Sequence, residues 1–145
     1  MLSILYQDEH LVAIDKPAGL LVHRSALDAG ETRCAVQLLQ AQLGRAVWPL
    51  HRLDKGTSGL LLFGLDREAA RAAGLLWGSD AAPLRKTYLA VVRGWPADEP
   101  GLIDHPLRRL DDDRRATARA LSVQPARTGW HTLARAALPL PQGAF

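Results

Sequence analysis

Short apolar segments separated by polar breaks dominate the first part of the chain and predict β-strands. Ser3–Tyr6 and Leu11–Asp15 are rich in strand-forming residues, and the polar stretch Gln7–His10 between them predicts a turn. Ala46–Leu50 and Leu60–Phe63 are almost entirely apolar and predict two buried strands.

Two other segments carry apolar residues at helical spacing. Thr32–Leu43 repeats them every three or four positions, and Gly44 predicts the end of that helix. Asp66–Trp77 predicts a second helix, with Asp66 as its N-cap and Glu68 near the positive end of the helix dipole. Strands interleaved with two helices, without the regular spacing of βαβ units, indicate an α+β fold.

The later part of the chain predicts more strands. Arg85–Trp95 alternates with apolar groups on both faces, which is typical of a strand in the middle of a sheet. Ala118–Val123 and His131–Leu140 predict two further strands. The charged run Asp111–Arg115 predicts a solvated loop or hairpin tip, and the alternative is that its arginines contact a phosphate backbone.

Composition narrows the class of protein. With 145 residues, 48% hydrophobic residues and a net charge of +3, the chain has the size and balance of one globular domain, and a polyanionic partner is allowed but not required. The single cysteine, Cys34, excludes an internal disulfide. Because the amino terminus lacks a basic start and no apolar run approaches the ~20 residues of a membrane span, we expect a cytoplasmic protein with no membrane partner.

Several kinds of site are excluded by spacing. The five histidines form no pair with ligand spacing and there is one cysteine, so we expect no metal. The glycines of Gly56–Gly59 lack the lysine and the spacing of a nucleotide-binding loop. No serine lies in a nucleophile-elbow context.

The run His51–Gly59 is the strongest candidate for chemistry, because it inserts charged and hydroxyl side chains between two apolar segments. Within it, Asp54 has cationic neighbours in Arg52 and Lys55 that would favour its ionised form, and an ionised carboxylate can act as nucleophile or base. The alternative is that Asp54 caps the turn by accepting hydrogen bonds from the backbone amides two and three residues ahead.

Three segments together resemble the RluA-type RNA pseudouridine synthases in order and spacing: Ile14–His23, His51–Leu62 and Lys86–Gly94. The resemblance implies a mixed, largely antiparallel sheet with flanking helices. It also implies an isomerase that converts a uridine already in RNA to pseudouridine after flipping it out of the stack, with no cofactor.

The resemblance also implies roles for individual residues. Asp54 matches the catalytic aspartate, which attacks the ribose anomeric carbon or the uracil ring, or removes a ribose proton to give a glycal. Arg52 matches the arginine that fills the gap left by the flipped nucleotide, and Tyr88 matches the tyrosine that packs against the uracil. Lys16 and Pro17 are interpreted as scaffold. The residues expected to support the active-site loop are His51, Leu53, Thr57, Ser58 and Gly59.

Within the family, Ile4–Glu9 with His23–Ser25 and Leu27–Asp28 is most similar to the branch that acts on a uridine in the T-stem of tRNA. Family members continue beyond position 145 with a segment that supplies an arginine partner for the aspartate. We therefore expect residues 1–145 to be the amino-terminal portion of one catalytic domain, with no separate RNA-binding domain. The alternatives are a non-catalytic RNA-binding remnant and a half-enzyme completed by another chain.

Overall fold

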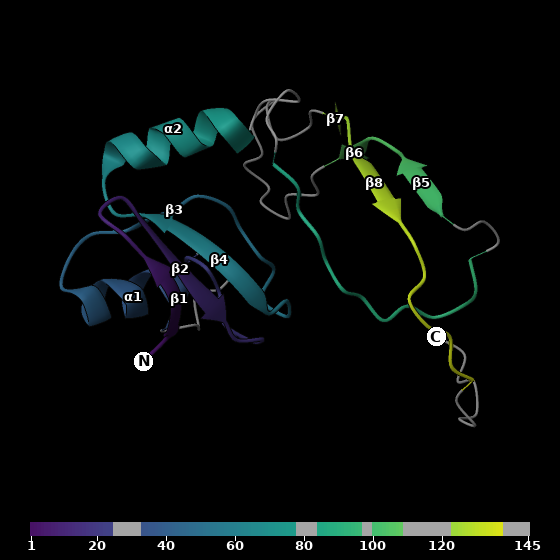
Figure 1. The fold of residues 1–145 in the computed structure, drawn as a ribbon, viewed down its shortest axis with the longest axis horizontal. Helices are drawn as coiled ribbons and strands as arrows, with labels where there is room; N and C mark the ends of the chain where they lie inside the picture. Colours follow the sequence, from purple (N-terminus) through teal and green to yellow (C-terminus); the bar gives the residue numbers. More distant parts are fainter. Residues whose placement is uncertain (25–32, 78–83, 97–99, 109–122, 138–145) are drawn as a thin grey trace, which may run out of the picture. The chain divides into compact units, whose positions relative to one another are not determined.

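A computed structural model of the chain describes residues 1–24, 33–77, 84–96, 100–108 and 123–137 (Figure 1). These residues belong to two compact units, Met1–Tyr88 and Leu89–Phe145. The predicted run Asp111–Arg115, most of the predicted strand Ala118–Val123, and residues 138–140 lie outside the described residues.

The first unit is a four-stranded sheet with two helices. Its strands pair antiparallel in the order β1-β2-β4-β3. The elements are β1 (Ser3–Gln7), β2 (Leu11–Lys16), α1 (Ala35–Leu43), β3 (Trp48–Pro49), β4 (Gly59–Gly64) and α2 (Arg67–Trp77). The α+β class is confirmed, and so is the largely antiparallel sheet.

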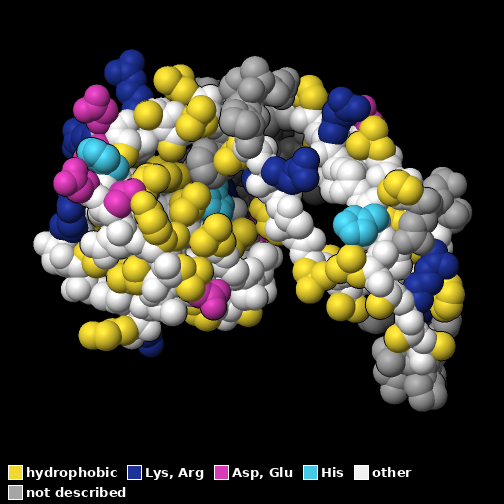
Figure 2. Space-filling model, viewed as in Figure 1, with side chains coloured by type: hydrophobic (Ala, Val, Ile, Leu, Met, Phe, Trp, Pro, Cys, Tyr) yellow, Lys and Arg dark blue, Asp and Glu magenta, His cyan; other side chains and the backbone are white. Residues whose placement is uncertain are grey.

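The core lies on the face of the sheet that α1 covers. Val12 and Ile14 point to that face from β2, opposite Phe63 and Leu61 on β4, and all four are fully buried. Leu39 of α1 packs into the same cluster. Because side chains alternate along a strand, Leu62 points to the other face, where it lines a hollow of about 560 Å³ together with residues of α2. Figure 2 shows hydrophobic side chains on the visible surface of this unit.

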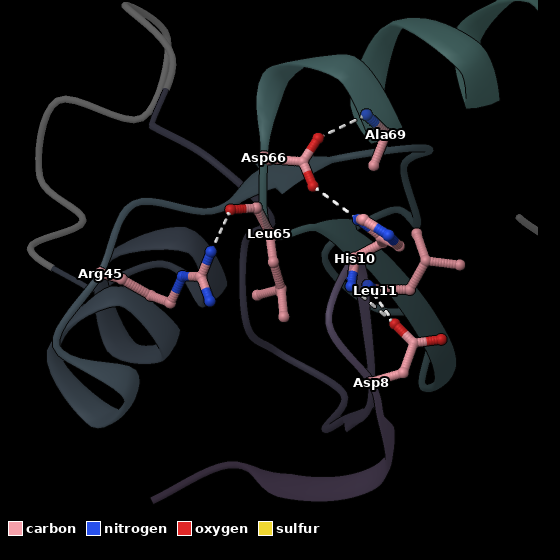
Figure 3. Close-up of polar contacts among 7 residues, drawn as sticks. All are labelled: Asp8, His10, Leu11, Arg45, Leu65, Asp66 and Ala69. Atoms are coloured by element: carbon pink, nitrogen blue, oxygen red, sulfur yellow. Dashed lines mark hydrogen bonds and ion pairs between the residues drawn. The ribbon is translucent and has the colours of Figure 1, made fainter.

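The end of α1 and the start of α2 lie where the sequence predicts them. Gly44 follows α1 in the left-handed region at φ 66°, and its amide donates to the Gln40 carbonyl. At the start of α2 the Asp66 carboxylate accepts from the Ala69 amide at 2.7 Å and contacts His10 Nδ1 at 3.0 Å (Figure 3). The α1 helix begins at Ala35, three residues later than predicted.

Two predicted strands are wrong in extent. The segment Ala46–Leu50 forms only the two-residue β3, because Pro49 has no N–H to donate to a ladder. The segment His131–Leu140 forms no strand over residues 131–137, and the strand lies earlier, at β8 (Arg127–Trp130).

The predicted central strand Arg85–Trp95 is also wrong. None of these residues is in a strand, and Leu89, Val91 and Val92 are 85%, 102% and 68% exposed. Alternating apolar residues favour a strand only where a neighbouring strand satisfies the backbone, and the described residues offer this segment none.

The second unit contains two small sheets. The strand β5 (Gly101–Asp104) pairs antiparallel with β8, and β6 (Leu107–Arg108) pairs with β7 (Val123–Gln124). The Trp130 indole lies against Gly101, its cross-strand partner, and an exposed ion pair of 3.2 Å joins Arg127 to Asp104.

Candidate active site

The loop His51–Gly59 is anchored at its start by its histidine. The Leu50 amide donates to the Leu62 carbonyl at 2.9 Å, and the Leu62 amide donates to His51 Nε2 at 3.1 Å. A ring nitrogen that accepts carries no proton, so this contact requires the neutral imidazole with its proton on Nδ1. Burial lowers the pKa of His51. A hydrogen bond with the backbone of Arg52 opposes this shift, and the nearby charge of Lys86 adds to it. His51 therefore fastens the loop to β4 as a neutral group.

Asp54 stands at the start of a tight turn. The Thr57 amide donates to the backbone carbonyl of Asp54 at 3.0 Å, so the turn is closed by the main chain and not by the carboxylate. Asp54 is exposed, and the hydrogen bonds and ion pairs recorded between described residues do not include its carboxylate. The capping role is thus filled by the backbone, which leaves the acid group accessible to a substrate.

A second turn, Lys16–Leu20, is hydrogen-bonded to the same loop. Lys16 is the one charged side chain that is fully buried among the described residues. Its Nζ donates to the carbonyls of Pro17, Leu20 and Lys55 at 3.0, 2.7 and 3.3 Å. Burial lowers the pKa of Lys16, and the negative charge of Asp54 opposes that shift.

The Gly19 amide donates to the Lys55 carbonyl as well, at 2.7 Å. Gly19 has φ 83°, a conformation that glycine adopts without strain. One carbonyl next to Asp54 in sequence is therefore held by two donors from the other turn.

A hollow of about 460 Å³ opens beside the loop. Its lining residues are His23, Pro49, Leu50, His51, Arg52, Lys86 and Tyr88. It brings together Arg52 and Tyr88, the two residues predicted to bind substrate. No carboxylate is among the lining residues, so the hollow is suited to a negatively charged ligand with an aromatic ring.

The other predicted residues lie outside that lining. Asp54 and Ser58 are exposed, Thr57 is half-buried, and Leu53 packs against the core. Gly59 begins β4 at φ 120°, which other residues adopt only with strain. These positions are consistent with support of the loop.

Sequence reasoning missed the buried position of Lys16. The signal was present, since Lys16 has the same strand parity as Val12 and Ile14 and so points to the core face of β2. It also missed His23 and Lys86 as neighbours of Arg52, because that proximity depends on the fold.

The described residues contain no group of three or more side chains suited to hold a metal ion. None of their helices is long and apolar enough to cross a membrane.

Comparison with known proteins identifies the family. The profile of the RNA pseudouridylate synthases matches residues 10–141. The chain belongs to this family. The matched residues include all three segments on which the resemblance rests, Ile14–His23, His51–Leu62 and Lys86–Gly94. The resemblance to this family is therefore confirmed.

Curated relatives agree with the assignment. The tRNA pseudouridine synthase C of Vibrio cholerae is 44% identical over 147 residues, which cover 100% of this chain and 59% of that protein. The tRNA pseudouridine synthase C of Haemophilus ducreyi is 44% identical over 99% of the chain and 58% of its own length. The chain thus spans less than two thirds of these relatives.

Solved structures share the fold. Human RNA pseudouridylate synthase domain containing 1 superposes with a TM-score of 0.62 at 23% identity, covering 89% of this chain and 51% of that one. Human RNA pseudouridylate synthase domain containing 4 gives 0.56 at 24% identity, over 92% and 54%.

Proposed function

We propose that this chain carries the catalytic aspartate of an RNA pseudouridine synthase that acts on tRNA. The observation that carries the proposal is the loop His51–Gly59, which presents an exposed Asp54 on a turn fixed by the main chain, in a chain that belongs to this family. The names of the curated relatives support tRNA as the substrate class. The branch resemblance in Ile4–Glu9 supports a uridine of the T-stem.

The proposed reaction is an isomerisation and needs no external reactant. The bond between uracil N1 and the ribose anomeric carbon breaks, the base turns, and C5 of the same uracil bonds to the anomeric carbon. C5 loses its proton and N1 takes one up, so the atoms of substrate and product are the same. Asp54 takes part as the attacking carboxylate or as the base that removes a ribose proton, and the exposed carboxylate supports either role.

The hollow beside the loop is proposed to receive the flipped nucleotide. Tyr88 provides a ring for the uracil, and stacking of this kind contributes about 1–3 kcal/mol per base. Arg52 fills the gap left in the RNA, and Lys86 adds a positive charge on the lining that suits a phosphate. We further propose that residues 1–145 belong to one catalytic domain.

The Asp54→Asn variant tests this proposal. Incubated with unmodified tRNA, it should form no pseudouridine above background. It should melt close to the temperature of the parent chain, because the carboxylate is exposed and takes part in none of the hydrogen bonds and ion pairs described above. The matched control is Asp15→Asn, an exposed aspartate on β2, which should leave turnover unchanged. Pseudouridine formed by Asp54→Asn at the parental rate would refute the proposed role.

A second candidate is RNA binding without catalysis. It is favoured by one observation: the cationic and aromatic residues share a hollow that Asp54 does not line. Binding of tRNA by the parent chain with no pseudouridine formed would select this candidate.

A further inference from the structure

Trp95 and Arg135 form an exposed pair in the second unit that the proposed reaction does not use. The guanidinium carbon of Arg135 lies over the Trp95 ring, 5.3 Å from its centre, which is within the range of a cation–π contact. Trp95 precedes β5 and Arg135 follows β8, so the pair connects the two segments that flank one antiparallel sheet. The Trp95 side chain is nevertheless 66% exposed. Much of its ring is therefore open to a second planar group.

The contact with Arg135 prepares the Trp95 ring for binding. A guanidinium over an indole is attracted to the negative face of the ring, and the contact restricts the rotation of both side chains. A ring that is already held in place loses little conformational freedom when a ligand stacks on it. The Trp130 ring is different, because it is half-buried and lies against Gly101. Trp95 is thus the indole of this unit that is available to a ligand.

The charge around the pair favours an anion. The described residues of the second unit include one acidic residue, Asp104, and four arginines: Arg93, Arg108, Arg127 and Arg135. Asp104 forms an ion pair of 3.2 Å with Arg127, which offsets its charge. Figure 2 shows basic side chains, in dark blue, on the visible face of this unit. An aromatic ring next to excess positive charge is the combination with which proteins bind unpaired nucleotides.

We propose that Trp95 and Arg135 form a second RNA contact: an unpaired base stacks on the Trp95 ring, and the Arg135 guanidinium binds the phosphate next to that base. The inference rests on the proposed function, because it takes RNA as the ligand class. The contacted nucleotide is not the target uridine, and neither residue takes part in the reaction at Asp54. A second copy of this chain is a poorer partner, because self-association through this surface would bring arginines together.

The first experiment measures binding of a short oligocytidylate by fluorescence anisotropy. This RNA contains no uridine to react, whereas stacking on an aromatic ring tolerates any base. Trp95→Ala should weaken binding by at least about 5-fold, as expected for the loss of one stacked base, and Trp95→Phe should keep most of the affinity. The matched control is Leu133→Ala, which removes an exposed apolar side chain without a ring and should change affinity less than about twofold. Parental affinity in Trp95→Ala would overturn the inference.

The indole emission of the protein gives an independent measure of stacking. Addition of oligocytidylate should quench the emission of the parent chain, and Trp95→Phe should lose most of that quenching although three other tryptophans remain. Equal quenching in the parent and in Trp95→Phe would show that the base stacks elsewhere. Both measurements read binding alone. The inference can therefore fail while Asp54 proves to be catalytic, and it can hold if Asp54→Asn forms pseudouridine at the parental rate.

The role of Arg135 is tested by salt. Arg135→Gln should reduce the slope of log affinity against log salt by about 0.7, the value expected for one phosphate contact with a single strand. Arg127→Gln is the matched control, because its guanidinium is already paired with Asp104, and it should leave the slope close to that of the parent. Identical slopes for both variants would exclude the phosphate contact of Arg135.

Sedimentation of the parent chain and of Trp95→Ala tests the alternative partner. Both should sediment as the same species. A parent chain that self-associates, with Trp95→Ala dissociated and its RNA affinity unchanged, would assign this surface to a contact between copies and overturn the inference.

Discussion

Burial along β2 includes one charged side chain, on the same face as the core residues. Val12, Ile14 and Lys16 alternate with Ala13 and Asp15, and all three of the former are fully buried although one is a lysine. The side-chain charge of Lys16 is tolerated because every donor hydrogen has a carbonyl partner. Residue type predicted scaffold at this position, whereas the partners that make burial possible come from a loop that only the fold brings near.

At the scale of a residue, two glycines should respond oppositely to the same substitution. A Cβ at Gly64 would lie 3.1 Å from the Ala70 amide nitrogen and 3.2 Å from the Asp66 carbonyl, both backbone atoms, whereas Gly74 on α2 has nothing within 4 Å. Gly64→Ala should therefore destabilise the chain by about 1–3 kcal/mol. Gly74→Ala should stabilise it by about 0.5–1 kcal/mol, since it removes backbone freedom within a helix.

Urea denaturation of the two variants and the parent chain measures both changes. Equal free energies of unfolding for Gly64→Ala and the parent would show that the start of α2 moves away from β4 at little cost.

At the scale of an element, the amino end of α2 depends on a pair of titrating groups. Asp66 caps the helix, and its hydrogen bonds to the Ala69 amide and to His10 lower the pKa of the carboxyl. The hydrogen bond to Asp66 raises the pKa of His10 above its usual value of about 6.5. The raised pKa of His10 stabilises the folded state below about pH 6.5, and this stability is lost as the pH rises through the folded-state pKa of His10.

The lowered pKa of Asp66 stabilises the folded state above about pH 4, and this stability is lost as the pH falls through the folded-state pKa of Asp66.

His10→Ala should therefore lower the melting temperature at about pH 5.5 and have little effect at about pH 9. Both groups are on the surface, so the change should be small and should shrink in high salt. In an Asp66→Asn background the pH dependence of the His10→Ala effect should become smaller, because Asp66 makes the largest contribution to the raised pKa of His10. A His10→Ala effect of the same size at both pH values would contradict this account.

Some of the helices and strands could be predicted from their own residues, and others could not. β1, β2, β4 and both helices were predicted because their own residues supply the pattern, the caps and the stops. The prediction of a strand over Arg85–Trp95 was wrong because alternation describes the segment itself and not whether another strand lies beside it to accept and donate hydrogen bonds. The position of Asp54 on a turn was predictable from its glycines, but the closure of that turn by the backbone was not.

At the scale of the whole molecule, the exposed apolar side chains of the second unit and the cationic hollow of the first unit suit different partners. Leu89, Val91 and Val92 of the second unit are exposed. The hollow of the first unit instead carries His23, Arg52 and Lys86. The first surface suits burial against protein, and the second suits an anionic ligand.

Binding of tRNA should accordingly depend on salt through the second surface. Lys86→Gln should weaken binding and reduce the slope of log affinity against log salt by about 1, as expected for one lost phosphate contact. Arg71→Gln removes an exposed cation of α2 that does not line the hollow, and it should leave the slope unchanged. Filter binding at several salt concentrations measures both, and identical slopes for the two variants would exclude Lys86 from the RNA contact.

The Lys55 carbonyl has a consequence for how this sequence tolerates recombination. It is shared by donors from Lys16 and Gly19, so a single oxygen couples two motifs that are encoded far apart. A chimera with a relative, joined anywhere between residues 21 and 50, would have to inherit matching spacings on both sides of the junction. One residue inserted between Lys16 and Gly19 would misalign both donors at once, whereas an insertion in the connection between α1 and β3 would leave them in place. The two motifs are therefore expected to be exchanged as one unit or not at all.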